Sequence, residues 1–264
     1  MLEVKSVSKT YGKRDAKTKA LDRVSFNVPD GAVVAIIGKS GSGKSTLMHA
    51  MSGLDSIDGG SIIFQSHDIH KMSRKESERF RAKELGFIFQ SFFIEPNVNV
   101  YQNVQLPLEI GRVRRRQRKT LVNAALDSVG LLDKSGARAR DLSGGQKQRL
   151  AIARAIVHKP RLIFADEPTG NLDSVTGDKI IKLLFGLNKS LGATLIIVTH
   201  DHELADKCQV KIELVDGKLR SLTRGKMSLP AKKTSLSKEA TEMERLGTKM
   251  SAKTSKKPQR KVVS

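Results

Sequence analysis

The chain has 264 residues, with 48 Lys and Arg against 27 Asp and Glu, and its net charge at pH 7 is +21. Its 38% hydrophobic and 28% charged residues indicate a chain with a globular part rather than a wholly disordered one. No stretch approaches the ~18 uninterrupted apolar residues of a membrane-spanning helix, and the first residues lack the pattern of a secretion signal. One cysteine, Cys208, excludes an internal disulfide, and without a Cys/His cluster we expect no zinc site.

The positive charge is unevenly distributed along the chain. Residues 224–264 carry 12 Lys and Arg, 3 Glu and no aromatic residue, which gives this segment a net charge of +9. Because such a segment can bury little surface, we expect a folded domain over residues 1–222 and a flexible basic tail over 223–264. A second group of bases, here called the basic cluster, consists of Arg112, Arg114, Arg115, Arg116, Arg118 and Lys119.

Short apolar runs alternate with helical patterns over the first 222 residues. The apolar runs predict strands over 2–7, 24–28, 32–37, 87–89, 162–165 and 195–198. The stretches between them predict helices over 45–51, 74–84, 118–129, 146–157 and 175–191. Asp216-Gly217, between two further apolar runs, predicts a hairpin turn. Strands that alternate with crossover helices make an α/β fold the expected class.

A P-loop pattern follows the strand predicted over 32–37. It fits G-x-x-x-x-G-K-[ST] in the strand–loop–helix context that the pattern requires, and reads Gly38-Lys39-Ser40-Gly41-Ser42-Gly43-Lys44-Ser45-Thr46. Glycines let successive backbone N–H groups point into one concavity, and the helix N-terminus adds its positive dipole end. We expect Lys44 to reach the β- and γ-phosphates of a nucleotide and the Ser45 hydroxyl to ligate Mg²⁺.

Two adjacent carboxylates end the strand predicted over 162–165. Asp166 is the expected Mg²⁺ ligand, and Glu167 is the expected group that orients and deprotonates the attacking water. A guanine-specific enzyme would also carry the pattern N-K-x-D. The nearest candidate, residues 188–191, ends in Leu191 and lacks the base-binding carboxylate, so guanine specificity is disfavoured.

A second helix N-terminus suited to bind phosphate is predicted at residues 142–146, which read Leu142-Ser143-Gly144-Gly145-Gln146. Ser143 can cap the helix that follows, and the two glycines allow a phosphate to approach its N-terminus closely. A single nucleotide has room for one P-loop around its phosphates. We therefore expect the second helix start to serve a nucleotide held by another subunit.

In this order the motifs resemble those of the ATP-binding cassette (ABC) ATPases, with residues 38–45 as Walker A, 166–167 as Walker B and 142–146 as the family signature. The resemblance covers about residues 1–222. It implies a P-loop NTPase (RecA-like) core with an antiparallel β subdomain and an α-helical subdomain inserted over about 91–141. It also implies that ATP and Mg²⁺ bind here.

The resemblance assigns roles to further residues. Tyr11 would stack on adenine, Gln90 would touch Mg²⁺ and water, Asp173 would couple the two sites, and His200 would contact the γ-phosphate. The expected catalytic residues are Glu167, His200, Gln90 and Lys44, and the expected Mg²⁺ ligands are Ser45, Gln90 and Asp166. The expected nucleotide contacts are Tyr11, Gly38 to Thr46, Ser143 to Gln146, and Asp173.

Segments 53–55, 86–91, 92–96, 98–108 and 166–173 are similar to the ABC group of lipoprotein release, macrolide efflux and antimicrobial-peptide resistance. This similarity implies a peripheral subunit on the cytoplasmic face of the membrane, which forms a homodimer with ATP. It would power a separately encoded membrane permease for export, lipoprotein release or mechanotransmission. Lys39 and Glu95 stand where the group usually has smaller or apolar residues.

Two alternative functions stay open. A cell-division-type ABC ATPase that regulates a permease-like partner has a similar build. The net charge also suits a nucleic-acid-associated ABC ATPase, but Lys44 and Asp166 are only 122 positions apart, and the chain has one ATPase unit. No specific nucleic acid is therefore expected. The basic tail suits an anionic membrane surface, and the basic cluster suits either that surface or a merely solvated face.

Overall fold

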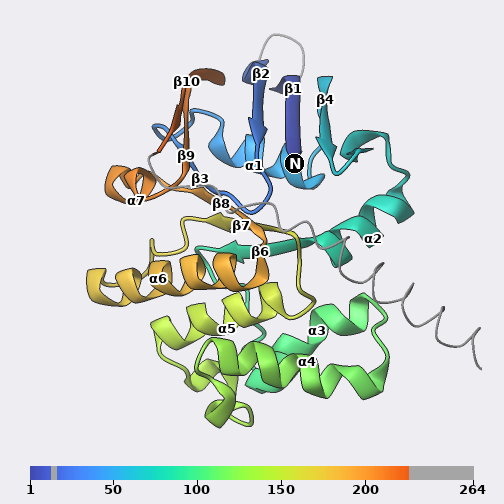
Figure 1. Cartoon of the computed structure of the whole chain (residues 1–264), viewed down its shortest axis with the longest axis vertical. Helices are drawn as coiled ribbons and strands as arrows, with labels where there is room; N and C mark the ends of the chain where they lie inside the picture. The colour runs from blue at the N-terminus through green and yellow to red at the C-terminus, as the bar shows by residue number, and fades with distance from the viewer. Residues whose placement is uncertain (13–16, 226–264) are drawn as a thin grey trace, which may run out of the picture. The chain divides into compact units, whose positions relative to one another are not determined.

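Figure 1 shows the computed structural model, which describes residues 1–12 and 17–225. Most of the tail predicted over 223–264 lies outside the described residues. The last strand, β10 (Lys218–Arg224), runs two residues past the expected boundary at Leu222.

Two β-sheets form the framework of the chain. The smaller sheet is antiparallel and has the strand order β2-β1-β4-β5. Its strands are β1 (Leu2–Tyr11), β2 (Thr18–Val28), β4 (Gly59–Phe64) and β5 (His67–Asp68). The larger sheet has the order β10-β9-β3-β8-β7-β6 and is parallel except for the edge strand β10. Its other strands are β3 (Val33–Ile37), β6 (Leu85–Phe89), β7 (Leu162–Asp166), β8 (Thr194–Val198) and β9 (Val210–Val215).

Seven α-helices and three short 3-10 turns connect the strands of the described part. The helices are α1 (Lys44–Ser52), α2 (Arg74–Glu84), α3 (Val100–Ile110), α4 (Arg115–Ser128), α5 (Gly144–Ile156), α6 (Ser174–Leu191) and α7 (His202–Asp206). The 3-10 turns span Ile69–Lys71, Leu132–Lys134 and Ala139–Asp141.

Helix α1 lies between the two sheets, as Figure 1 shows. Its apolar side chains Leu47, Met48 and Met51 are fully buried, in one hydrophobic cluster with Val4 of the small sheet and Ile36 of the large one. Burying a side chain of this size contributes about 1.5–3 kcal/mol. The helix that follows the P-loop is therefore held from both sides.

The other face of the large sheet is covered by α5 and α6, and α3 and α4 pack beyond α5 (Figure 1). A single hydrophobic cluster runs from Ile197 on the sheet through Leu150 of α5 to Val104 of α3 and Leu126 of α4. The segment over 91–141 thus contains α3, α4 and two 3-10 turns, and its core continues into that of the sheet.

The α/β class predicted from the sequence is confirmed, and each of the five predicted helices is present with ends within three residues of the prediction. Two elements were not predicted: α3, whose interior contains Pro107, and β4, which opens with Gly59-Gly60. Both residue types argue against regular structure. The predicted strand over 24–28 was too short, because the exposed side of β2 carries polar residues back to Thr18.

Candidate nucleotide-binding site

The P-loop connects the buried strand β3 to the buried helix α1. Gly41 and Gly43 adopt left-handed backbone conformations, with φ of +78° and +98°, and a Cβ atom at Gly43 would lie 2.4 Å from the backbone oxygen of Ala20. Glycine is therefore required at position 43. The Lys44 Nζ atom donates hydrogen bonds of 2.9 Å to the backbone oxygens of Gly38 and Lys39, so its side chain curls back over the loop.

A cavity of about 760 Å³ opens over the P-loop. Its lining residues come from the P-loop and the start of α1, from strands β1 and β2, from the ends of β7 and β8, and from the β9–β10 turn. They are Tyr11, Thr18, Lys19, Ala20, Ser40, Gly41, Gly43, Lys44, Ser45, Thr46, Asp166, Glu167, Val198, His200 and Asp216. The structure thus brings Lys44, Ser45, Asp166, Glu167 and His200 to one cavity, with Tyr11 at the same cavity.

The two carboxylates reach the cavity by different backbone geometries. Asp166 is the last residue of β7, whereas Glu167 has a left-handed φ of +43° and its backbone N–H donates to Val198 at 2.9 Å. A non-glycine residue in this conformation is uncommon and is found disproportionately at functional sites. The turn directs both neighbouring side chains into one space, although neighbours on a regular strand point to opposite faces.

The half-buried carboxyl of Asp166 lies beside the second negative charge of Glu167. Burial raises the pKa of the Asp166 carboxyl, and the negative charge of Glu167 raises this pKa further, while His49 and Lys44 partly offset both effects. The positive charges around the Asp166 carboxylate do not fully compensate its negative charge. It is suited to meet a cation that arrives with the nucleotide.

His200 follows strand β8 and contacts the second carboxylate. Its Nδ1 atom lies 3.1 Å from the Oε1 atom of Glu167, and its side chain is 73% exposed. The exposed imidazole leaves its other ring nitrogen accessible from the cavity. The residues expected to carry the hydrolysis, Glu167 and His200, are therefore already in hydrogen-bond contact.

Gln90 is not among the residues that line this cavity. Its side-chain Nε2 donates to Oδ1 of Asn171 at 3.4 Å, and its backbone oxygen accepts from Nδ2 of Asn171 at 2.9 Å. These two hydrogen bonds join the segment after β6 to the segment after the Walker B carboxylates. The structure thus separates Gln90 from the two other expected Mg²⁺ ligands, Ser45 and Asp166.

The signature residues line a second cavity, of about 650 Å³, which shares no lining residue with the first. Ser143 caps α5: its hydroxyl accepts from the backbone N–H of Gln146, whose side chain accepts from the backbone N–H of Ser143. Asp173 caps α6 and accepts from Thr176 at 2.9 Å. Gly144 and Gly145 also line this second cavity.

Sequence reasoning missed several residues of the first cavity. Thr18, Lys19 and Ala20 enter from strand β2, and Asp216 enters from the hairpin turn that the sequence did predict. That turn is tied to the P-loop, because the backbone N–H of Gly217 donates to the backbone oxygen of Ser42 at 3.1 Å. The Asp-Gly pair was a usable signal for the turn, but nothing local indicated that the turn would border the P-loop.

The residues present fit a nucleotide with its divalent cation. The Ser42 hydroxyl is buried and has no hydrogen-bond partner among the described residues, and it lies beside left-handed glycines that form an anion cradle. In the described part, no group of three or more His, Cys, Asp and Glu is arranged to hold a metal. Mg²⁺ takes few protein ligands and completes its shell with phosphate oxygens and water. Ser45 and Asp166 are the cavity residues suited to hold it.

A phosphate cradle, a carboxylate pair beside it and a separate capped helix start define a P-loop nucleoside triphosphatase of the cassette type. A family model described as ABC transporter matches residues 21–170. The chain is also 41% identical, over 223 residues, to the lipoprotein-releasing system ATP-binding protein LolD of Colwellia psychrerythraea, covering 84% of this chain and 86% of that protein. The chain belongs to the ABC transporter family, in which this domain binds and hydrolyses ATP.

Solved cassette structures have the same fold. A dimeric post-hydrolysis structure of the ATP-binding cassette MJ0796, bound to ADP and Pi, matches with a TM-score of 0.78 and 34% identity, over 86% of this chain and all of that one. CbiO1 from Clostridium perfringens matches with a TM-score of 0.77 and 28% identity, over 96% of this chain and 95% of that one. The comparisons favour a transporter ATPase over the cell-division and nucleic-acid alternatives.

The raised pKa of Asp166 predicts opposite effects of Asp166→Asn on stability and on nucleotide binding. The substitution removes a charge that is unfavourable without nucleotide, so the Tm of the nucleotide-free protein should rise by about 1–3 °C. The affinity for MgATP should fall at least ~10-fold, because a cation ligand is lost. Differential scanning fluorimetry and a binding titration measure the two effects.

The sign of the pH dependence is fixed by the direction of the pKa shift. A carboxyl with a raised pKa destabilises the fold when it is ionised, so the Tm difference should be present at neutral pH and vanish below about pH 4. Asp206→Asn is the matched control, because a hydrogen bond from Lys211 lowers the pKa of Asp206 and its loss should not raise the Tm. A lower Tm for Asp166→Asn would contradict the interpretation.

Proposed function

We propose that this chain is the ATP-hydrolysing subunit that powers a separately encoded membrane permease, for export, lipoprotein release or mechanotransmission. The observation that carries the proposal is the single cavity that combines Lys44, Asp166, Glu167 and His200. The relative from Colwellia psychrerythraea is the ATP-binding protein of a lipoprotein-releasing system. Among the helices of the described part, none has the length and apolarity of a membrane span.

The residues of the cavity have distinct roles in the proposed hydrolysis. The backbone N–H groups of the P-loop and the Lys44 ammonium bind the phosphates of ATP. Ser45 and Asp166 hold Mg²⁺, which neutralises phosphate charge when bound. Gln90 joins them only if its side chain leaves Asn171, to which it is hydrogen-bonded. Tyr11, a residue that is 41% exposed and lines the cavity, provides a ring face for adenine.

Glu167 and His200 carry the chemical step. A water oxygen attacks the γ-phosphorus, the bond from the γ-phosphorus to the β–γ bridging oxygen breaks, and ADP leaves with that oxygen. The Glu167 carboxylate accepts the proton that the water loses. His200 holds this carboxylate in place through its contact at 3.1 Å and presents its ring to the γ-phosphate. Catalysis here is mainly positioning and charge stabilisation.

The proposed active unit is a head-to-tail homodimer. One chain supplies the P-loop cavity, and the other supplies the cavity lined by Ser143, Gly145 and Asp173. The N-terminus of α5, with two glycines in its first turn, then approaches the same phosphates from the opposite side. The dimeric cassette structures with the same fold support this assembly.

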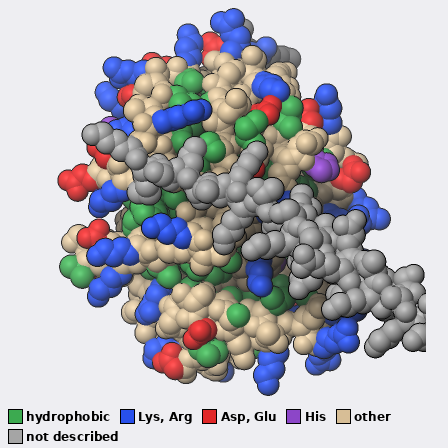
Figure 2. All heavy atoms as spheres, viewed as in Figure 1, with side chains coloured by type: hydrophobic (Ala, Val, Ile, Leu, Met, Phe, Trp, Pro, Cys, Tyr) green, Lys and Arg blue, Asp and Glu red, His purple; other side chains and the backbone are tan. Residues whose placement is uncertain are grey.

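We place the subunit on the cytoplasmic face of the membrane. The basic cluster suits this location, because Arg114, Arg115 and Arg116 are exposed around the start of α4, where bases oppose the helix dipole. Arg118 alone of the cluster has an ion pair in the described part, with Glu109 at 2.9 Å. On the face shown in Figure 2, Lys and Arg side chains are spread among Asp and Glu, unlike the basic stripe of a nucleic-acid binder.

Glu167→Gln should keep ATP binding and nearly abolish turnover. The amide retains the size of the side chain but cannot accept the proton of water, so kcat should fall by about 10²–10⁴-fold. With hydrolysis blocked, ATP should hold the dimer closed, which light scattering coupled to gel filtration detects. Glu78→Gln on the surface of α2 is the control and should hydrolyse ATP normally. Wild-type turnover by Glu167→Gln would overturn the assignment.

Anionic vesicles should bind the full chain more tightly than neutral vesicles. Replacing Arg114, Arg115 and Arg116 with Gln should weaken that binding at least ~10-fold, since each base near the surface contributes about 1 kcal/mol. The same triple replacement with Lys keeps the charge and should keep the binding. A chain that ends at residue 225 tests the contribution of the tail in the same flotation assay. If the chain that ends at residue 225 and the chain with the three Gln replacements both bind anionic vesicles as tightly as the full chain, the membrane assignment is contradicted.

A further inference from the structure

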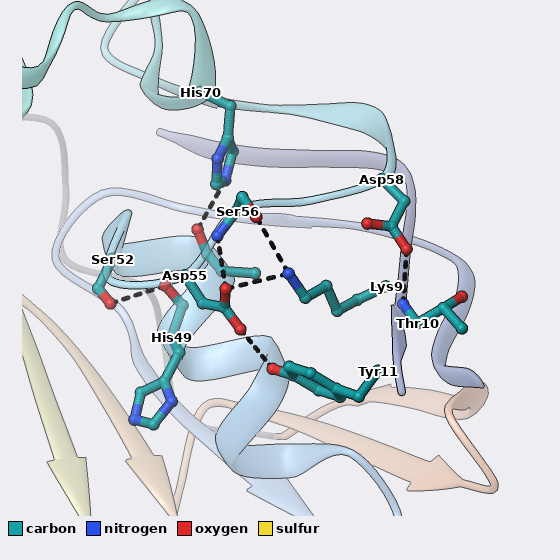
Figure 3. Close-up of polar contacts among 10 residues, drawn as sticks. Lys9, Thr10, Tyr11, His49, Ser52, Asp55, Ser56, Asp58 and His70 are labelled. Atoms are coloured by element: carbon teal, nitrogen blue, oxygen red, sulfur yellow. Dashed lines mark hydrogen bonds and ion pairs between the residues drawn. The ribbon is translucent and has the colours of Figure 1, made fainter. Parts of the chain in front are cut away.

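Lys9 of strand β1 is the one lysine of the described part that is buried, with 7% of its surface exposed. Its Nζ atom donates hydrogen bonds of 3.0 Å to Oδ1 of Asp55 and to Oγ of Ser56, as Figure 3 shows. The same ammonium lies 5.1 Å from the centroid of the Tyr11 ring, within range of a cation–π interaction. Burying an ammonium costs free energy unless it is paired, and even a buried pair adds little net stability, so the burial of Lys9 indicates a role other than stability.

Asp55 joins the lysine to the tyrosine. One carboxylate oxygen accepts from Lys9 and from the backbone N–H of Ser56, and the other accepts from the Tyr11 hydroxyl (Figure 3). Burial opposes ionisation of Asp55, but the hydrogen bonds from Tyr11 and Lys9 outweigh it and lower its pKa. Burial and the bond to Asp55 raise the pKa of Tyr11, which keeps the hydroxyl a donor. The ring is thus fixed at its hydroxyl and on its face.

The network is built on the far end of the P-loop helix. Helix α1 begins at Lys44 and ends at Ser52, and the backbone N–H groups of Leu54 and Asp55 both donate to the backbone oxygen of His49, at 3.0 and 3.3 Å. Asp55 therefore occupies a position defined by the same helix that presents its N-terminus to the phosphates. Tyr11 is held relative to the phosphate cradle through this rigid element.

The pair is not needed simply to attach the loop after α1 to strand β1. Asp58 of the same loop makes that attachment separately: its Oδ2 accepts from the backbone N–H of Thr10 at 2.7 Å, and its backbone N–H donates to Ser8 at 2.9 Å. A buried ion pair contributes little net stability over apolar residues of similar volume. What Lys9 and Asp55 add is contact with the Tyr11 ring.

We propose that Lys9 and Asp55 are positioning residues that hold the Tyr11 ring as a rigid platform for the base of ATP. The proposal rests on the proposed role of Tyr11 at the nucleotide site. Neither residue lines the cavity, and both act through the ring. Lys9 and Asp55 therefore increase the affinity for the base of ATP and not for its phosphates, which the P-loop binds. A fixed ring binds adenine without first losing its own conformational freedom.

The test compares ATP with inorganic triphosphate as ligands of the full chain. Lys9→Met and Asp55→Asn should each raise the Kd for ATP about 5- to 10-fold, while leaving the Kd for triphosphate and the kcat at saturating ATP within about 2-fold. Asp58→Asn is the matched control, because it removes the negative charge of a neighbouring carboxylate that does not contact Tyr11, and it should leave both Kd values unchanged. Tyr11→Ala should weaken ATP binding selectively.

A double-mutant cycle separates positioning from a structural role. If Asp55 acts through the ring, Asp55→Asn should have no further effect on ATP binding in the Tyr11→Ala background. Equal weakening of ATP and triphosphate, or additive effects of the two substitutions, would overturn the proposal. If Tyr11→Ala leaves ATP binding unchanged, the proposed role of the Tyr11 ring in binding the base is refuted. If Tyr11→Ala weakens it but Lys9→Met and Asp55→Asn do not, the platform stands and the positioning role is refuted.

Discussion

The site depends on one constraint: a short glycine loop must hold its backbone N–H groups convergent between a buried strand and a buried helix. Such an arrangement is a ready-made anion site, because the convergent donors and the helix dipole act at the same point. The loop keeps its shape because the strand before it and the helix after it are buried in the hydrophobic core, with Ile36 and Leu47 both inaccessible to solvent. Close approach of the backbone at Gly43 leaves no room for a side chain. Core packing is therefore what organises the phosphate cradle.

The two carboxylates that the proposed mechanism uses are positioned by the same sheet. Strand β7 is next to β8, so Asp166, Glu167 and His200 emerge at one edge of the sheet, next to the end of β3 that leads into the P-loop. This is the expected location of a ligand in a parallel sheet, at the carboxyl ends of the strands. The signature start at Ser143 lies elsewhere on the molecule and lines its own cavity. In the proposed mechanism these two cavities are the two halves of one site, so a second copy of the chain is needed to complete it.

Much of the fold and site was predictable because the signals are local. The P-loop, the strand that ends in Asp166 and the cap at Ser143 each depend on residues that are neighbours in sequence. Contacts between distant segments were not predictable in this way. The pairing of Gln90 with Asn171 brings together two loops that are 81 positions apart, and the position of Asp216 beside the P-loop depends on the order of strands in the sheet. The burial of Lys9 was not predictable either, because a register shift between Val4 and Val7 moves Lys9 to the inward-facing side of β1, and its partner Asp55 lies in a distant segment.

The central claim is that the signature of one copy completes the P-loop site of another, and disulfide cross-linking tests it most directly. Cys208 is buried and its pKa is raised to about 12 by that burial, so it should not interfere. Chains with Ser40→Cys and chains with Ser143→Cys, both carrying Glu167→Gln, are mixed and oxidised with and without ATP. The account predicts a disulfide-linked dimer of the two different chains that forms with ATP and not with either chain alone. Absence of this cross-link in a mixture that still binds ATP would contradict it.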